Sequence, residues 1–459
     1  MTRGTGMRRS PATDHTTDDA PSVPRTAAVS ASTAWVRPYG RTRASAGHAR
    51  RVTAQSPCAA AAAAHRVDQD VRAAVGRVLE QVLADRVARA RVLDPLFAVD
   101  IAERVARFSR GGARSRSQLL WWSLRACGGA DGLPVAAALR IGAALELLQT
   151  CALIHDDVID GSALRRGRPT LHTDVREQYA HTVPPARLAS FAGASAILAG
   201  DLALSWADDL LAESPPAPGT APAVRRLWSD MRTEMVAGQY LDVHGQATAS
   251  HSMLRARRTA CLKSARYSVE RPLALGAALA GADEATRRQL GRAGQRVGMA
   301  FQLRDDLNDV FGDPRITGKP AGGDIREGKP TYLIALARER LEAVGDRHAL
   351  AVLEGALGRP DLTRDHLDQV RQILTATGVR DSAEARIEEL VTQGLRHLDS
   401  AGLDRVAGRR LGELLHTVAG AGGGGGGTRA AGGDGQRGGP GFVERGDAAL
   451  ESHGERARP

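Results

Sequence analysis

Apolar residues recur every three or four positions over most of this chain, and this helical period most limits the folds available to it. From Val67 the pattern runs through Val71, Val75, Leu79 and Val82, which is the spacing of one face of an α-helix. No run of the sequence alternates between apolar and polar residues for long enough to predict a sheet. The sequence therefore predicts an all-α fold.

The two ends of the chain differ in composition from this helical part. Residues 1–65 carry nine arginines against three aspartates, and residues 418–459 include six consecutive glycines. Segments of this kind bury too little apolar surface to fold. We expect a disordered arm over 1–65, one folded domain over 66–417 and a disordered tail over 418–459.

Composition also argues against several functional classes. Much of the formal net charge of +10 lies in the N-terminal arm and only 3% of the residues are aromatic, so we expect no nucleic-acid partner. The most apolar segment, 188–207, is interrupted by Asp201, which predicts a buried helix and no transmembrane segment. Widely spaced cysteines without a C-x-x-C pair indicate a reducing, cytoplasmic setting: Cys58, Cys127, Cys151 and Cys261.

The helical pattern divides at glycines and prolines into separate segments. We predict a long helix over 136–159 and a loop over 213–222. Further helices are expected around 224–246, 252–281, 284–311, 329–343 and 364–417.

An Asp-Asp-x-x-Asp pattern occurs twice, each time at the C-terminal end of an apolar helix. The first copy runs from Asp156 to Asp160 and the second from Asp305 to Asp309. Residues i and i+4 share a helix face, where two carboxylates repel each other and are disfavoured by the helix dipole. A bound cation such as magnesium relieves that repulsion. An acidic, solvated helix end is the alternative for one copy, but two copies favour a metal site.

Basic residues follow both acidic patterns. Arg165 and Arg166 come after the first, and Lys319 and Lys329 come after the second. Arginine forks and lysine charges beside a metal–carboxylate site suit a diphosphate, whose oxygens can be shared between metal and cations. The combination predicts metal-assisted chemistry on a diphosphate.

These motifs resemble those of the trans-isoprenyl diphosphate synthases, the polyprenyl synthetase family. The resemblance extends through Gly238-Gln239-Tyr240-Leu241-Asp242 and Lys263-Ser264, and segment 267–276 is similar to actinobacterial geranylgeranyl diphosphate synthases. It implies a catalytic domain over 66–417, built as an isoprenoid synthase-type helical bundle around a central cavity. It also implies a homodimer.

The resemblance further implies a role for individual residues. Three magnesium ions per active site would be held by Asp156, Asp157, Asp160, Asp305, Asp306 and Asp309. The allylic diphosphate would meet Arg165, Lys263, Lys319, Gln302 and Lys329, while Gln239, Lys263 and Ser264 would help to stabilise the cation formed from it. The diphosphate of isopentenyl diphosphate would be held by Arg114, Arg116, Gln149 and Arg166.

One part of the second substrate site departs from the family pattern. The family motif Gly-Gly-Lys-Arg-x-Arg-Pro reads here as Gly111 to Ser117, with Ala113 in place of the lysine and Ser117 in place of the proline. Losing one charge-assisted contact would weaken binding by on the order of 1.5–3 kcal/mol. A non-catalytic subunit of a heteromeric synthase is therefore an alternative interpretation. A terpene cyclase is less consistent with the arginine pair and the second Asp pattern.

Residues upstream of Asp156 are expected to set product length. Leu148, Cys151 and Ala152 lie one and two turns before the first Asp pattern. Small residues at the two nearer positions predict a product longer than farnesyl, most consistent with geranylgeranyl diphosphate. A longer polyprenyl chain is the alternative, and the sequence leaves the allylic primer open.

Overall fold

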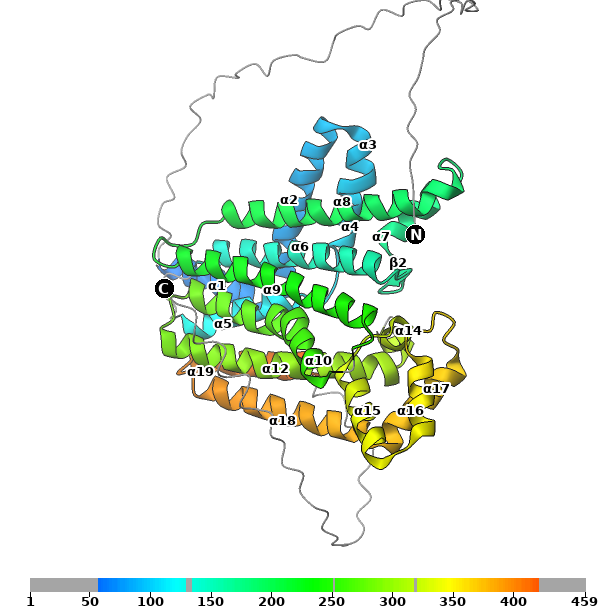
Figure 1. Ribbon diagram of the computed structural model, residues 1–459. Coiled ribbons are helices and arrows are strands. Elements are labelled where there is room, and N and C mark those ends of the chain that lie inside the picture. The colour runs from blue at the N-terminus through cyan, green and yellow to red at the C-terminus, as the bar shows by residue number, and fades with distance from the viewer. Residues whose placement is uncertain (1–56, 129–133, 251, 318–319, 421–459) are drawn as a thin grey trace, which may run out of the picture. The chain divides into compact units, whose positions relative to one another are not determined.

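A computed structural model describes residues 57–128, 134–250, 252–317 and 320–420, and its regular structure is almost entirely helical (Figure 1). This confirms the all-α prediction. The first helices are α1 (Pro57–Gln69), α2 (Val71–Leu93), α3 (Pro95–Phe97), the π-helix η1 (Ala98–Ala102), α4 (Glu103–Phe108), α5 (Ser115–Cys127), α6 (Val135–Ile159), α7 (Leu171–Gln178) and α8 (Pro185–Ala212).

The later helices complete the fold. They are α9 (Ala221–Ala247), α10 (Met253–Ala260), the π-helix η2 (Cys261–Glu270), α11 (Arg271–Leu279), α12 (Glu284–Phe311), α13 (Pro314–Thr317), α14 (Gly323–Glu327), α15 (Tyr332–Val344), α16 (Arg347–Ala356), α17 (Arg364–Ala376), α18 (Val379–Asp399) and α19 (Arg405–Val418). A short antiparallel hairpin, β1 (Leu164–Arg165) and β2 (Arg168–Pro169), follows α6.

Buried apolar side chains form two clusters that meet at α5 and α11. The first joins α2, α6, α8 and α9, and the second joins α12, α15, α17, α18 and α19. α11 packs closely against α5 because Gly276 has no side chain: a Cβ there would lie 2.3 Å from the Leu120 carbonyl oxygen. The two clusters thus hold α6 and α12, the helices with the Asp patterns, in one packed unit.

Several boundaries differ from those predicted. α1 begins at Pro57, inside the expected disordered arm, because its alanine-rich sequence favours helix and Ala64 is buried. The segment 364–417 is three helices rather than one, since the backbone is left-handed at Gly378 (φ +69°) and Gly402 (φ +64°). The remaining parts of the predicted arm and tail, 1–56 and 421–459, lie outside the described residues.

Two helices, α6 and α8, are long and apolar enough to cross a membrane by length and composition alone. The most apolar stretch of α6 is 61% buried, as expected of a core helix. The corresponding stretch of α8 is 33% buried: it packs on α6 through small residues and leaves Phe191, Ile197 and Leu198 exposed. α8 is therefore less buried than the sequence predicted.

Candidate active site

The first Asp cluster lies at the C-terminal end of α6 and is surrounded by donors. Asp156 Oδ1 accepts hydrogen bonds from Lys263 Nζ (3.2 Å) and Gln239 Nε2 (3.3 Å). Its other oxygen, Oδ2, accepts from Arg165 Nη2 (3.2 Å). Burial alone would raise the pKa of Asp156, but the charges of Lys263, Lys329 and Arg165 hold that pKa at about 2. This carboxylate is thus ionised at neutral pH.

The β1–β2 hairpin turns Arg165 back towards α6. Its central residues, Arg166 (φ +53°) and Gly167 (φ +72°), both adopt positive φ, as a two-residue type I′ turn requires. Arg165 Nε donates to Asp157 Oδ1 at 2.6 Å, and Asp157 is almost completely buried. Arg165 therefore contacts both Asp156 and Asp157 of the first Asp cluster.

The second Asp cluster lies near the end of α12. Asp306 is buried and accepts a hydrogen bond from Gln302 Nε2 (2.6 Å), while Asp305 is exposed. Asp309 accepts from the backbone N–H groups of Gly323 (3.2 Å) and Asp324 (3.0 Å), so it holds the start of α14.

Like charges crowd this second cluster. Burial, followed by repulsion from Asp324, raises the pKa of Asp306 well above its usual range. Burial and the same neighbour raise the pKa of Asp309 to about 7. The cluster is short of positive charge as it stands.

Two lysines join the carboxylates of different helices. Lys329 Nζ, which follows α14, lies 2.9 Å from Asp160 Oδ2 of α6, 2.5 Å from Glu327 Oε2 and 3.6 Å from Asp324 Oδ1. Lys263 Nζ of η2 lies 2.5 Å from Asp242 Oδ2 of α9 as well as 3.2 Å from Asp156. Lys263 thus links α6 with α9, and Lys329 links the end of α6 with α14, whose first N–H groups donate to Asp309 of the second cluster. We call Lys263 and Lys329 with these carboxylates the lysine bridge.

The donor chemistry of this site fits a divalent cation with a preference for oxygen. Asp160 Oδ1 is buried without a hydrogen-bond partner, and the raised pKa values of Asp306 and Asp309 come partly from mutual repulsion. A cation would satisfy both features. Within the described ranges, no three acidic, histidine or cysteine side chains converge into a ready-made ion site. Asp156 and Asp160 are paired with the amines of Lys263 and Lys329.

A second group of cations lies between the start of α5 and the hairpin. The loop before α5 is left-handed at Gly111, Gly112 and Arg114. Gly112 suits this position because its φ is +77°, and a Cβ there would also lie 3.0 Å from Arg166 Nη2. Burial lowers the pKa of Arg166, and the charges of Arg165, Arg116 and Arg114 lower it further, against the attraction of Glu146.

This arginine group has unused hydrogen-bonding capacity. Arg114 Nη1, Arg116 Nε and Gln149 Oε1 are buried without hydrogen-bond partners. Ala113 is exposed, and Ser117 Oγ contacts Glu146 Oε1 at 2.6 Å. Clustered guanidinium groups that repel one another form a natural anion site.

The remaining predicted residues are distributed as follows. Leu148 and Cys151 are buried on α6, and Ala152 is half-buried. Burial, with smaller contributions from Asp201 and Asp208, raises the pKa of the Cys151 thiol to about 12, so the thiol is neutral. Ser264 follows Lys263 in η2 and is half-buried. Lys319 lies outside the described residues.

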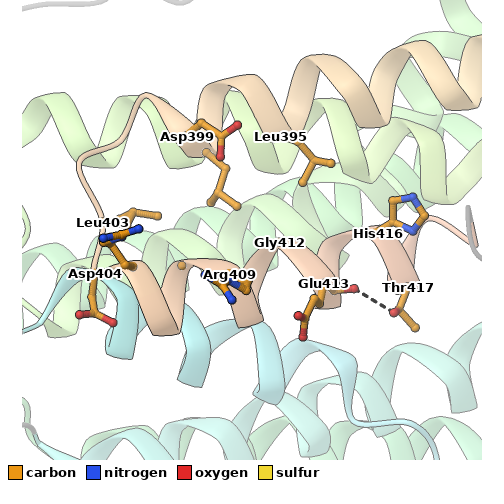
Figure 2. Close-up of a pocket in the computed structure, with 12 residues that line it drawn as sticks. Leu395, Asp399, Leu403, Asp404, Arg409, Gly412, Glu413, His416 and Thr417 are labelled. Atoms are coloured by element: carbon orange, nitrogen blue, oxygen red, sulfur yellow. Dashed lines mark hydrogen bonds between the residues drawn. The ribbon is translucent and has the colours of Figure 1, made fainter.

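One hollow adjoins this site, and another lies apart from it. One of about 380 Å³ is lined by Glu327, Lys329 and Pro330 and adjoins the lysine bridge. The other, of about 810 Å³, lies between α18 and α19 (Figure 2) and is lined by none of the predicted site residues. Leu403, Arg409 and His416 are among the side chains around it.

Sequence reasoning assigned no role to four acidic residues that shape the site. Asp242 pairs with Lys263, Asp324 and Glu327 pair with Lys329, and Glu146 faces the arginine group. Asp242 was detectable, because it lies one turn after Gln239 on the same face of α9. Asp324 and Glu327 lie five and two residues before Lys329 and were also within reach of sequence reasoning. Only the approach of Glu146 to the arginine group depends on distant segments.

The polyprenyl synthetase family model matches residues 101–374. The chain is 30% identical to the geranylfarnesyl diphosphate synthase of Aeropyrum pernix over 60% of this chain and 79% of that one. It is 31% identical to the (2E,6E)-farnesyl diphosphate synthase of Mycobacterium bovis over 63% of this chain and 75% of that one.

A solved structure gives a similar result. The geranylgeranyl pyrophosphate synthase of Corynebacterium glutamicum, complexed with isoprenyl diphosphate and magnesium, is similar with a TM-score of 0.70 and 34% identity, over 75% of this chain and 98% of that one. The sequence match and the fold agree, and the chain belongs to the polyprenyl synthetase family.

Proposed function

We propose that this prenyl diphosphate synthase makes geranylgeranyl diphosphate, by adding isopentenyl diphosphate head to tail to an allylic diphosphate. The observation that carries the proposal is the approach of the two Asp clusters. Lys329 pairs with Asp160 of the first cluster and with Asp324, whose backbone N–H donates to Asp309 of the second. Carboxylates for a metal and lysines for a diphosphate meet there. We also propose a cytoplasmic location.

Magnesium would be held mainly by Asp156, Asp160 and Asp305, and when bound it would stabilise the leaving pyrophosphate. Asp305 is exposed, and the main partners of Asp156 and Asp160 are the cations Lys263 and Lys329, which a bound diphosphate would attract away from them. Asp157, Asp306 and Asp309 are instead engaged by Arg165, by Gln302 and by backbone N–H groups. We propose that these three aspartates hold the structure around the metal site. We expect that site to bind three magnesium ions.

The protein's own cations would bind the allylic diphosphate. Lys263 and Lys329 would exchange their present carboxylate contacts for diphosphate oxygens, helped by Arg165 and Lys319. The allylic carbon–oxygen bond then breaks, and the electron pair leaves with pyrophosphate. Gln239, beside Asp156, and Ser264, beside Lys263, would orient dipoles towards the resulting cation.

The second substrate would bind at the arginine group. Arg114, Arg116, Gln149 and Arg166 would hold its diphosphate, while its double bond attacks the allylic cation and a proton is lost to pyrophosphate. The unpaired buried atoms of three of these residues support this assignment. Gln302 of α12 and Lys329, which follows α14, would instead contact the allylic diphosphate.

Ala152 provides a test of product length. It lies one helical turn, about 5.4 Å along the axis, before Asp156, where a larger ring would block the growing chain. We expect Ala152→Phe to shorten the main product from geranylgeranyl to farnesyl diphosphate, measured by chromatography of the hydrolysed alcohols. Ala152→Ser, which stays small, should keep the longer product. An unchanged product from an active Ala152→Phe enzyme would remove this residue from the cavity wall.

We further propose that the protein is a homodimer that covers the exposed face of α8. Phe191, Ile197 and Leu198 are 37%, 48% and 60% exposed on this apolar helix. Burying such a face against a second copy is the simplest way to remove it from water. Sedimentation of the purified protein tests the oligomeric state.

The central experiment supplies purified protein with isopentenyl diphosphate and dimethylallyl, geranyl or farnesyl diphosphate, with magnesium or with a chelator. Magnesium-dependent formation of the twenty-carbon product is the expected result. Longer or shorter products would leave the enzyme class intact and overturn the length. Failure to extend any primer would favour the non-catalytic subunit and identify Ala113 as a disabling loss.

A further inference from the structure

Among the arginines of the proposed second substrate site, Arg116 contacts two residues of the π-helix η2. Its Nη2 donates a hydrogen bond to Ser268 Oγ at 2.7 Å. Its guanidinium carbon lies 4.6 Å from the centre of the Tyr267 ring, which is cation–π geometry. Its Nε is buried and has no hydrogen-bond partner. One side of the guanidinium is thus fixed by η2, and a donor is left for a ligand.

The same π-helix also contacts the first substrate site. Lys263, five residues before Ser268, reaches Asp156 of α6. A π-helix is closed by hydrogen bonds between residues five apart, so its wide turn brings Lys263 and Ser268 one above the other. In an α-helix, positions five apart point in clearly different directions. The π winding therefore lets one element contact both predicted substrate sites.

We propose that Ser268, supported by the Tyr267 ring, is a positioning residue that fixes Arg116 for the diphosphate of isopentenyl diphosphate. This inference rests on the proposed function and adds a residue to it. A serine hydroxyl that accepts from a guanidinium restricts the rotation of a long, flexible side chain. Through η2, the orientation of Arg116 is set relative to Lys263 at the allylic site.

The alternative is a purely structural contact between α5 and η2. Ser123 supplies the matched comparison, because it is a buried serine of α5 whose Oγ donates to the Leu273 carbonyl of α11, the helix after η2, at 2.7 Å. A structural role predicts similar effects at Ser123 and Ser268. A positioning role predicts a change in substrate binding at Ser268 alone.

Steady-state kinetics of the full-length enzyme separate these possibilities. We expect Ser268→Ala to raise KM for isopentenyl diphosphate on the order of tenfold, with kcat and KM for the allylic substrate within about twofold. Tyr267→Leu should raise the same KM, and Tyr267→Phe, which retains the ring, should raise it less. Ser123→Ala should lower the melting temperature without changing KM.

The Arg116→Ala background gives the decisive control. If Ser268 acts through Arg116, adding Ser268→Ala to Arg116→Ala should produce little further change in KM. An undiminished effect in that background, or equal increases in both KM values, would overturn the proposal. Wild type is assayed in parallel. An inactive wild type would count against the proposed function. An active wild type whose KM for isopentenyl diphosphate equals that of Ser268→Ala would count against this inference alone.

Discussion

Replacing Lys329 with methionine is expected to destabilise the magnesium-free protein by roughly 3 kcal/mol, because a buried charge pair loses one partner. Lys329 is the cation shared by Asp160, Glu327 and Asp324. Burial raises the pKa of Glu327 to about 7 even with the lysine present. The charge of Lys329 lowers this pKa, so removing the lysine should raise it further. A carboxyl group with a raised folded-state pKa loses stability as pH rises to that pKa. The variant therefore goes on losing stability above about pH 7, where wild type no longer does, and its deficit should be larger at pH 8 than at pH 6.

Urea unfolding with and without magnesium checks this expectation. Magnesium should recover part of the lost stability, because a ligand that binds only the folded state stabilises it. Arg410→Met is the matched control, since Arg410 makes an exposed ion pair with Glu413 and should contribute about 1 kcal/mol or less. Equal losses in the two variants would refute the bridging role of Lys329.

Asp156→Asn should reduce kcat by on the order of a thousandfold or more, equivalent to at least ~4 kcal/mol of transition-state stabilisation. Asp156 is the carboxylate on which Lys263, Gln239 and Arg165 converge. The amide keeps the shape of the side chain and removes its charge, so the loss reports on charge rather than packing.

Product formation under saturating substrates and magnesium measures this effect. Asp361→Asn serves as the control, since that side chain is 75% exposed and pairs only locally with Arg359. Its activity should match wild type. Retention of more than a tenth of wild-type kcat by Asp156→Asn would exclude Asp156 from the metal site.

Much of the fold was predictable because helical periodicity and helix-breaking residues act locally. The helix over 136–159 corresponds to α6, and the loop after residue 212 separates α8 from α9 as expected. The hairpin at Arg166 was not predicted, because each strand has only two residues and no alternation can develop. The division of 364–417 depends on left-handed glycines, which look like ordinary helix-interior glycines in the sequence.

The site was predictable to the extent that its residues cluster along the chain. Asp156 and Asp160, one turn apart, had to share a helix face. The contact between Lys329 and Asp160 joins residues 169 positions apart, and no local pattern indicates it. The same holds for the contact of Arg116 with Ser268.

The lysine bridge has a consequence for chemical labelling. The chain contains three lysines, Lys263, Lys319 and Lys329, whereas arginine supplies every other basic side chain apart from histidine. Lysine is a compact charge that reacts at its amine, and the guanidinium of arginine does not substitute for it in that chemistry. Reductive methylation with a carbon-13 reagent would therefore place its side-chain methyl groups only on these lysines. Their NMR signals would report substrate and metal occupancy directly, in an enzyme that otherwise carries no competing label beyond its N-terminal amine.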